Sequence, residues 1–343
     1  MYLDLKLLFM KGYKIMNGTE YKPSQTNQPS EANEKILKAI DEIEKVIVGK
    51  RTEILLLLTA MLAGSHVLIE DVPGTGKTTL AATIAKVAGL EFNRAQFTPD
   101  VMASDITGFN IYNRGKEEFE FRRGLVMCNL LLADEINRAS PKTQSALLEA
   151  MEEGKVTVDG TTYVIPTPFM VIATQNPAGY IGTYPLPEAQ LDRFALKISM
   201  GYPSHTEEIN IVKARRGINP LDKVERVLDA DELNKLCLAV DHVNVDDSIY
   251  AYIVDLVTGT RTHPKLSLGA SPRASVALMR LSQAYAFIKG RDYVLPDDVA
   301  GLFRYAIAHR VVLSQEAKLE RLTVDAVLTE ILRTTDVPYK GKR

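Results

Sequence analysis

The pattern of apolar and polar positions divides the chain into two parts with different periodicities. In the first part, short strand candidates alternate with helical patterns. The apolar runs are Val67–Ile69, Asn129–Glu135, Phe169–Thr174 and Ala195–Met200, and Glu91–Phe97 is a further strand candidate. Strands that are apolar along their whole length and separated by helices are typical of a parallel sheet with helices on both faces. We therefore predict an α/β fold with three layers for this part.

Two segments within this part have a different pattern. Residues Phe109–Arg123 alternate around the turn Asn113–Gly115, and residues Lys155–Ile165 alternate around Asp159–Gly160. Alternation on both sides of a short glycine turn is typical of a β-hairpin. We expect both hairpins to be inserted into the α/β core.

Two helices are predicted before the first strand. Ser30 is a suitable N-cap, and apolar residues then recur at helical spacing: Ile36, Leu37, Ile40, Ile43 and Ile47. The segment Val46–Gly49 breaks this helix. A second, very apolar helix is predicted over Arg51–Ala63, closed by Gly64.

From His205 onward we find no strong strand, and helical spacing dominates. The apolar positions are Leu233, Leu236 and Val240, then Tyr252, Val254 and Leu256, then Val276, Leu278, Leu281 and Ala284. Another helix is predicted after Pro296, where Asp297 and Asp298 precede Val299. We therefore divide the chain into a tail (residues 1–29), an α/β core (30–204) and an all-helical domain (205–343).

The first thirty residues are expected to lie outside the fold. Residues 17–30 are polar and contain Pro23 and Pro29, which indicates disorder. The apolar run Leu5–Met10 is too short for a typical signal peptide and has no small-residue cleavage site after it. Met16 is a candidate for the true start.

Composition and charge are those of an ordinary globular protein. The chain has 343 residues, of which 46% are apolar and 24% charged, and its net charge is −2. This balance gives no electrostatic reason to expect nucleic acid or an anionic membrane as partner. No stretch reaches the roughly 18 apolar residues of a membrane span. Cys128 and Cys237 have no metal-binding spacing, so we expect buried reduced thiols and a reducing cytoplasmic location.

A phosphate-binding loop is predicted after the run Val67–Ile69. The loop residues are Pro73, Gly74, Thr75, Gly76, Lys77, Thr78 and Thr79, and a helical pattern begins at Lys77. In such a loop the backbone N–H groups surround a phosphate, the lysine reaches the β- and γ-phosphates, and the Thr78 hydroxyl holds Mg²⁺. Asp71 stands where the usual motif has glycine, so we expect it to make the turn with less favourable backbone angles. The alternative is an ordinary turn before a helix.

Polar residues end the next two buried strands. Asp134 and Glu135 follow Leu130–Ala133, and Asn176 follows the strand Phe169–Thr174. The carboxyl ends of parallel strands meet at one edge, where ligands bind. There Asp134 can support Mg²⁺, Glu135 can activate water, and Asn176 can hydrogen-bond both water and the γ-phosphate. The alternatives are an acidic pair that caps the next helix and a simple Asn-Pro turn.

Two arginines complete the candidate catalytic set. Arg193 lies near the end of the core, and Arg273 lies at a helix start in the second domain. Phosphoryl transfer needs positive charge on the γ-phosphate oxygens, which arginine provides. The alternative for each is a surface salt bridge.

The order of these motifs resembles the AAA+ ATPases. The segments Gln96–Asp100, Asp134–Ala139, Leu186–Phe194 and Gly269–Ala274 are similar to those of the MoxR group, in the helix-2-insert clade. This resemblance implies a Walker A loop, a Walker B pair at Asp134 and Glu135, sensor 1 at Asn176, an arginine finger at Arg193 and sensor 2 at Arg273. It also implies that the hairpins are the helix-2 insert and the pre-sensor-1 hairpin, and that the helical domain is a lid.

The resemblance extends to the base of the nucleotide. Val46–Gly49 matches the segment that lines the adenine pocket in the family, so Val48 and Gly49 are expected to bind ATP. Lys50 departs from the pattern, because glutamine is common there. That departure leaves the side-chain contact at this position open.

The expected function is Mg²⁺-dependent ATP hydrolysis in a ring-shaped homo-oligomer, a hexamer by resemblance. The resemblance also implies chaperone-like remodelling of client proteins, often with von Willebrand A-domain partners. Whether Arg273 acts within its own subunit or across the interface is left open.

Two other functions remain as alternatives. A nucleic-acid motor would use Arg122, Arg123 and Lys155, but Glu117, Glu118 and Glu120 on the same hairpin would repel phosphate. A nucleotide-gated scaffold with little turnover is disfavoured because Glu135, Asn176 and Arg193 are all present.

Overall fold

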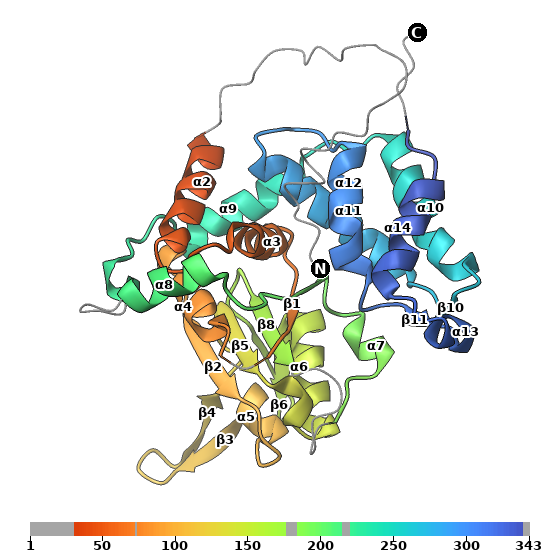
Figure 1. Cartoon of the computed structure of the whole chain (residues 1–343). Coiled ribbons are helices and arrows are strands. Elements are labelled where there is room, and N and C mark those ends of the chain that lie inside the picture. The colour runs from red at the N-terminus through yellow and green to blue at the C-terminus, as the bar shows by residue number, and fades with distance from the viewer. Residues whose placement is uncertain (1–30, 73, 176–183, 215–219, 339–343) are drawn as a thin grey trace.

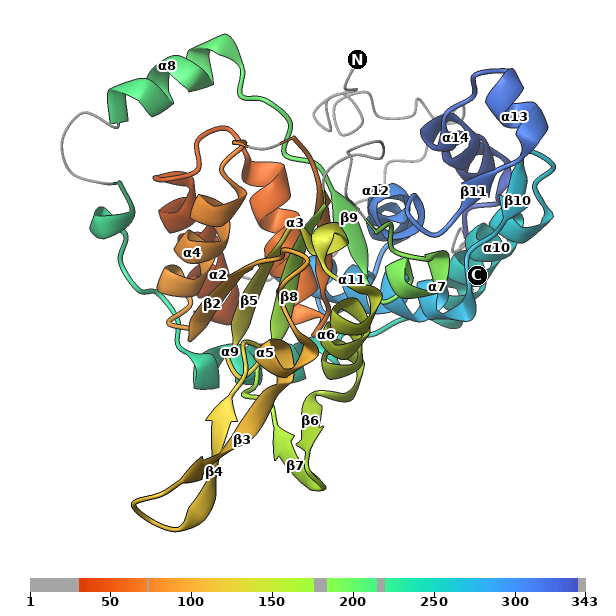
Figure 2. The same ribbon diagram turned by 90° about the horizontal axis from the view of Figure 1, so that it is seen from below.

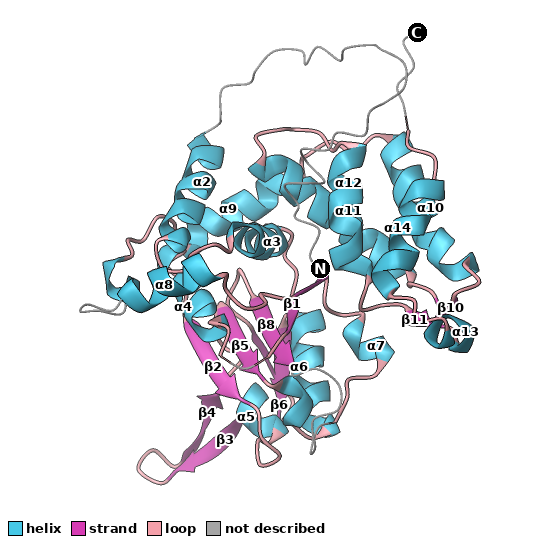
Figure 3. Cartoon of the chain, in the orientation of Figure 1, coloured by secondary structure: helices cyan, strands magenta, loops and turns pink. Residues whose placement is uncertain are grey.

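A five-stranded parallel sheet forms the centre of the molecule (Figures 1 and 3). The computed structural model describes residues 31–72, 74–175, 184–214 and 220–338. The strands have the order β2-β5-β8-β1-β9, and all neighbours are parallel. Their bounds are β1 (Val67–Glu70), β2 (Phe92–Gln96), β5 (Leu130–Asp134), β8 (Met170–Gln175) and β9 (Leu196–Ile198). The predicted parallel α/β sheet is confirmed.

The alternation of side chains along each strand divides the interior into two apolar clusters. Val67 and Ile69 of β1 belong to one cluster, whereas Leu68 between them belongs to the other. Successive side chains of a strand point to opposite faces of the sheet, so each face needs its own cover of helices. This is why β1, β5 and β8 are apolar along most of their length, whereas the edge strand β2 carries polar residues such as Arg94. We call the two clusters the lid-side core and the hairpin-side core.

Helices cover both faces. The lid-side core includes residues of α2 (Glu31–Glu44), α3 (Arg51–Leu62) and α4 (Lys77–Val87). The hairpin-side core includes residues of α5 (Ala103–Thr107) and α6 (Pro141–Glu153). The ends of α6 follow from its sequence, because Ser140 caps the N-terminus, proline opens the first turn and Gly154 closes the helix in the left-handed conformation.

Both predicted hairpins are confirmed. One consists of β3 (Gly108–Asn113) and β4 (Glu118–Arg123), the other of β6 (Lys155–Val158) and β7 (Thr161–Val164). They project from the same side of the molecule (Figure 2). The ring of Phe121 stacks on that of Tyr163, with centroids 3.8 Å apart and planes 9° apart, and Asn110 donates a hydrogen bond to Asp159 at 2.9 Å. The two hairpins therefore form one joined element.

The C-terminal part is largely helical. Its helices are α8 (His205–Ala214), α9 (Ala230–Val240), α10 (Asp247–Thr262), α11 (Pro272–Ile288), α12 (Pro296–Ile307), α13 (Gln315–Leu319) and α14 (Val324–Thr334).

Two details of this part correct our expectation. It is not entirely helical, because β10 (Leu266–Leu268) and β11 (Val312–Leu313) form a small antiparallel sheet. Val254 and Val276, which we placed in the apolar helical patterns, are each 51% exposed. Helical spacing predicts a helix, but it does not show which of the helix's side chains are covered by neighbouring elements. For this reason the outward position of these two valines was not foreseen.

The lid-side core continues from the first two helices into the C-terminal domain. Ile43 and Leu57 belong to the same apolar cluster as Leu236 of α9 and Leu281 of α11. The boundary at residues 204 and 205 stays a prediction, and the expected tail lies outside the described residues.

The two cysteines carry no disulfide. Cys128 is buried and Cys237 half-buried, and burial raises the pKa of the first thiol to about 12 and of the second to about 11. Neither thiol is therefore a nucleophile at neutral pH. Among the helices of the described residues, none combines the length and apolar character that a membrane crossing requires.

Candidate functional site

The predicted phosphate loop joins β1 to α4. Gly74 and Gly76 have φ angles of +86° and +88°, which only glycine adopts easily, and Gly76 is the N-cap of α4. Lys77 is the first residue of that helix, and its ammonium group donates a hydrogen bond to the carbonyl of Val72 at 2.8 Å. The loop thus presents a helix N-terminus and a cation together, which suits a phosphate. Pro73 lies outside the described residues.

Lys77 lies in an acidic environment. Burial lowers the pKa of its ammonium group, and the negative charges of Asp71, Asp134 and Glu135 oppose that shift. The carboxylates belong to the ends of β1 and β5, so the parallel sheet brings the loop lysine and the acidic pair to one edge. Thr78 and Thr79 occupy the next two positions of the first turn.

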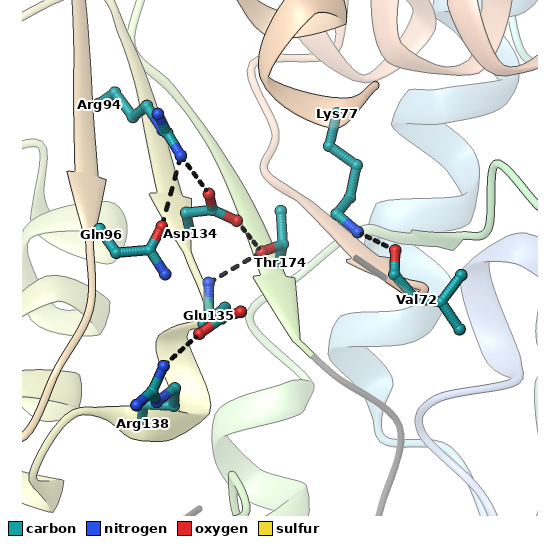
Figure 4. A network of polar contacts seen from close by, with 8 residues as sticks. All are labelled: Val72, Lys77, Arg94, Gln96, Asp134, Glu135, Arg138 and Thr174. Carbon is teal, nitrogen blue, oxygen red and sulfur yellow. Dashed lines mark hydrogen bonds and ion pairs between the residues drawn. The ribbon is translucent and has the colours of Figure 1, made fainter. Parts of the chain in front are cut away.

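Asp134 is held by a small polar network (Figure 4). The Thr174 hydroxyl donates a hydrogen bond to Asp134 Oδ1 at 2.7 Å, and accepts one from the backbone N–H of Glu135 at 2.8 Å. The guanidinium of Arg94 on β2 pairs with Asp134 Oδ2 at 2.9 Å. The two strands beside β5, β2 and β8, therefore each supply a side chain that positions this carboxylate.

Glu135 has a constrained backbone. Its φ of +57° is in the left-handed region, which is unusual for a residue other than glycine, asparagine or aspartate. Its carboxylate accepts a hydrogen bond from Arg138 at 2.9 Å, at the end of the short helix Ile136–Arg138. Left-handed residues of this kind occur often at functional sites.

The donor set suits Mg²⁺. Mg²⁺ prefers oxygen ligands and is usually held by one or two side chains together with substrate phosphates. Thr78 supplies a hydroxyl and Asp134 a carboxylate at the same sheet edge. The described residues contain no group of three or more histidines, cysteines or acids that would form an all-protein metal cage.

Asn176 follows Gln175, the last residue of β8, and lies outside the described residues. The strand itself is informative, because β8 lies between β5 and β1. It therefore ends between the acidic pair and the phosphate loop. Gln175 donates a hydrogen bond to Glu70, at the end of β1, at 2.9 Å.

Asp71 behaves differently from our expectation. It is not among the residues with positive φ, so the less favourable turn that we predicted is absent. Its buried carboxylate accepts backbone hydrogen bonds from Val72 at 2.9 Å, Met200 at 2.8 Å and Gly201 at 2.7 Å. A glycine could not do this, so the residue fastens the phosphate loop to the chain after β9.

Lys50 contacts the same segment. Its ammonium group donates a hydrogen bond to the carbonyl of Met200. The preceding Gly49 has a φ of +77°, and the side chain of Glu207 on α8 occupies the space that a Cβ would need. Val48 and Gly49, the expected adenine-pocket residues, therefore lie beside the connection from β9 to α8.

Arg193 and Arg273 lie together, on a residue that is not among the contacts of Lys77. Both guanidinium groups form ion pairs with Glu152, near the C-terminus of α6, and Arg193 also donates to the carbonyl of Leu148 at 2.9 Å. Within one chain, then, the predicted arginine finger and sensor 2 share one carboxylate. The salt bridges named as alternatives do form, and both arginines form them with the same residue.

The basic residues near the hairpins are largely paired. Arg123 forms an ion pair with Glu91 at 3.4 Å and donates to the Met127 carbonyl at 2.6 Å, and Lys155 pairs with Glu153 at 3.4 Å. Glu91 and Glu153 therefore offset the charge of two of the three basic side chains named for a nucleic-acid partner.

Sequence reasoning missed the residues that support the site. They are Arg94, Arg138, Thr174 and Glu152. Arg138 could have been found, because it is three residues from Glu135. The other three come from separate elements, so no local spacing identifies them.

Known families match both parts of the chain. The ATPase family associated with various cellular activities (AAA) matches residues 66–196, and the AAA lid domain matches residues 258–331.

Relatives and a solved structure match over most of the chain. Chaperone MoxR1 of Mycobacterium tuberculosis is 39% identical over 95% of this chain and 90% of its own length. YeaC of Bacillus subtilis is 52% identical over 88% of this chain and 95% of its own. A crystal structure from Cytophaga hutchinsonii, designated an ATPase, matches with a TM-score of 0.84 and 39% identity, over 90% of this chain and 96% of that one.

Proposed function

The chain belongs to the MoxR-type AAA+ ATPases, and on that premise we propose that it hydrolyses ATP at the interfaces of a ring and remodels client proteins. ATP hydrolysis by the P-loop follows from the family. The assembly into a ring, the binding of Mg²⁺ and the remodelling of a client protein are what we propose.

The observation that supports a ring most strongly is the position of the two arginines. Arg193 and Arg273 are bound to Glu152 on α6, whereas Lys77 lies among Asp71, Asp134 and Glu135. An arginine that is needed on the γ-phosphate but is bound to a different element of its own chain fits a site completed by a neighbour. Repeated head-to-tail contacts of that kind close into a ring, which we propose to be a hexamer.

The residues of one chain would divide the work on ATP. The loop amides and Lys77 bind the phosphates, and Val48 and Gly49 border the base. Thr78 and Asp134 would hold Mg²⁺, which supplies positive charge to the phosphate oxygens. Asn176 would position the attacking water.

Glu135 would take the proton from that water. In this structure one oxygen of its carboxylate is engaged by Arg138 at 2.9 Å and is therefore directed to that side chain rather than to a water. We infer that turnover requires Glu135 to leave Arg138. The left-handed backbone of Glu135 fixes the direction from which the carboxylate approaches.

Arg273 would act together with Arg193. Because both guanidinium groups lie on Glu152, an interface that brings Arg193 to the neighbour's ATP brings Arg273 there as well. We therefore propose that Arg273 also acts across the interface, with its shared partner Glu152 as the supporting observation.

The proposed output is movement of the joined hairpins against a client, with von Willebrand A-domain proteins as candidate partners. Exposed apolar side chains on the first hairpin support a protein partner: Phe109 is 46%, Tyr112 49% and Phe119 72% exposed. Glu135→Gln protein should retain an A-domain partner in ATP, and Lys77→Ala protein, which cannot bind ATP, should not. Equal recovery by both variants would contradict an ATP-dependent client.

Mixed rings test the shared site. Arg193→Ala subunits keep their own loop and Glu135 but lack the finger, and Glu135→Gln subunits keep the finger but cannot activate water. Each variant alone should lose most of its activity, because a finger is worth about 10³–10⁵ in rate. In a one-to-one mixture about one interface in four combines the two intact halves. The mixture should therefore recover activity that neither variant has.

Two outcomes would contradict the proposal. A mixture as inactive as its components would mean that Arg193 does not act across an interface. Hydrolysis by wild-type protein at the same rate per subunit in monomer and assembly would mean that no ring is needed.

A further inference from the structure

The short segment that carries Arg193 is held by the lid from two directions. It lies between α7 (Glu188–Leu191) and β9, and comprises Asp192, Arg193 and Phe194. The residues after α12 contact it through Arg310 and His309, and the N-terminus of α11 contacts it through Ser271.

Arg310 makes most of these contacts. Its guanidinium donates hydrogen bonds to the carbonyl of Asp192 at 3.0 Å and to the carbonyl of Phe194 at 2.9 Å, which are the residues on either side of Arg193. Its Nε lies 3.0 Å from Asp192 Oδ1 as an ion pair. The neighbouring His309 donates from Nε2 to the Phe194 carbonyl at 2.7 Å. Three hydrogen bonds thus hold the two backbone carbonyls on either side of the finger.

The same aspartate also links to the second lid helix. The Ser271 hydroxyl, which caps α11, donates a hydrogen bond to Asp192 Oδ2 at 2.7 Å and accepts one from the N–H of Arg273 at 3.1 Å. Asp192 therefore connects the finger segment to the helix that carries Arg273. One lid motion would act on both arginines.

Burial makes this contact firm. The side chain of Arg310 is 2% exposed and that of Asp192 is 14% exposed. Burial lowers the pKa of Arg310 to about 10 against the attraction of Asp192, so the guanidinium stays charged at neutral pH. Charge-assisted hydrogen bonds of a buried arginine are strong, and removing one partner leaves the other unpaired.

We propose that Arg310, assisted by His309 and Asp192, is the positioning residue through which the lid of a subunit sets the arginine finger that this subunit presents to its neighbour's ATP. The inference rests on the proposed function of Arg193. Arg310 itself contacts no substrate. It transmits the position of α12 to the backbone on both sides of the finger.

Substitution of Arg310 tests this. Arg310→Met should lower kcat about ten- to hundredfold, as expected for a misplaced catalytic group. KM and ATP affinity should change by less than about threefold, because the subunit's own loop is intact. Arg310→Lys should lie between, since a lysine keeps the charge but not the planar set of donors. Arg304→Met, which removes an exposed α12 ion pair with Asp325, is the matched control and should leave kcat unchanged.

Mixed rings separate positioning from general damage. Arg310→Met subunits keep an intact loop and Glu135, so mixing them with Glu135→Gln subunits should restore activity at interfaces where Glu135→Gln supplies the finger. Thermal unfolding checks that the variants are folded. Asp192→Asn, which keeps the shape of the side chain but weakens both lid contacts, should show the same pattern if Arg310→Met fails to fold.

Each outcome has a distinct meaning. If Arg193→Ala is rescued by Glu135→Gln but folded Arg310→Met is not, the inference is wrong and the shared site stands. If neither is rescued, the shared site fails and the inference fails with it. A loss confined to KM, with kcat unchanged, would also overturn the positioning role.

Discussion

Lys50 and Asp71 hold the same piece of chain with opposite charges. Asp71 accepts hydrogen bonds from the N–H groups of Met200 and Gly201, and Lys50 donates one to the carbonyl of Met200. Asp71 is also the departure from the usual phosphate-loop motif, and Lys50 is the departure from the family's adenine-pocket segment. The departures are therefore related, because both fasten the segment after β9 to the nucleotide site.

Restoring the common glycine should weaken the protein. Asp71→Gly removes a buried acceptor from three backbone N–H groups, so we expect a loss of about 2–4 kcal/mol in unfolding free energy. Denaturant unfolding measures it. Lys50→Gln is the companion variant: glutamine can still donate to the Met200 carbonyl, so its loss should stay under about 1 kcal/mol. An Asp71→Gly protein as stable as wild type would contradict the anchoring role.

Glu152 should compete with ring assembly. It neutralises Arg193 and Arg273 within one chain, and those ion pairs must break before the arginines reach a neighbour's ATP. Partly exposed pairs are worth up to about 1 kcal/mol each, so Glu152→Gln should lower the protein concentration for half-maximal ATPase activity about two- to tenfold. Titration of activity against protein concentration measures this. Glu153→Gln, on the same helix, should have no such effect, and equal shifts for both variants would count against the idea.

The two hairpins should be energetically coupled. The stacked Phe121 and Tyr163 rings predict a coupling free energy of about 0.5–1.5 kcal/mol in a double-mutant cycle with alanine. ATPase activity without client should stay within about twofold of wild type, because neither ring contacts the nucleotide site. The Tyr112–Phe119 pair is the control. Both rings lie within one hairpin, so their coupling free energy does not depend on contact between the two hairpins. Additive effects of Phe121→Ala and Tyr163→Ala would show that the hairpins are independent.

Stability should fall as the solution becomes acidic, partly through His66. This ring is buried, accepts from the Val171 N–H at 3.0 Å and donates to the Met151 carbonyl at 3.0 Å. Burial lowers its pKa to about 4, against 6.5 in the unfolded chain, so the unfolded state binds the extra proton between these values. The contribution of the neutral His66 ring to the unfolding free energy is fully present above pH 6.5. It is lost as the pH falls toward 4, and the total loss reaches about 3 kcal/mol.

Denaturant unfolding between pH 7.5 and 5 measures the slope. His66→Gln is the comparison, because a glutamine can make both hydrogen bonds but does not titrate. The variant should lose stability more slowly than wild type as the pH falls. Parallel curves would assign the acid sensitivity to other groups, such as the buried His309.

The sequence predicted the local structure of the core well. The runs Val67–Ile69 and Asn129–Glu135 became strands of one sheet with β8 between them, and the Asp159–Gly160 turn became a hairpin. These features could be read because strand burial and turn geometry depend on adjacent residues. The exposed Val254 and the three-residue strand Leu266–Leu268 could not be predicted, because each depends on what packs beside it.

The contacts that support the site could not be predicted from the sequence for the same reason. Thr174 contacts Asp134 because their strands pair. The Asp71 carboxylate accepts a hydrogen bond from Gly201, which is 130 residues further along the chain. Arg193 and Arg273 could be named from motifs. Their common partner Glu152 could be found only when three distant segments were folded together.

The uninterrupted lid-side core has a consequence for dissecting the molecule. A fragment ending at residue 204 would lose the cover of α9 and α11 over the apolar side chains of α2 and α3, including Ile43 and Leu57. Exposed surface of that kind costs about 25 cal/mol per Å² and promotes aggregation. The predicted boundary at residues 204 and 205, where alternating strands and helices give way to helices, is therefore not a position at which the protein can be cut. The two named domains should melt as a single cooperative unit.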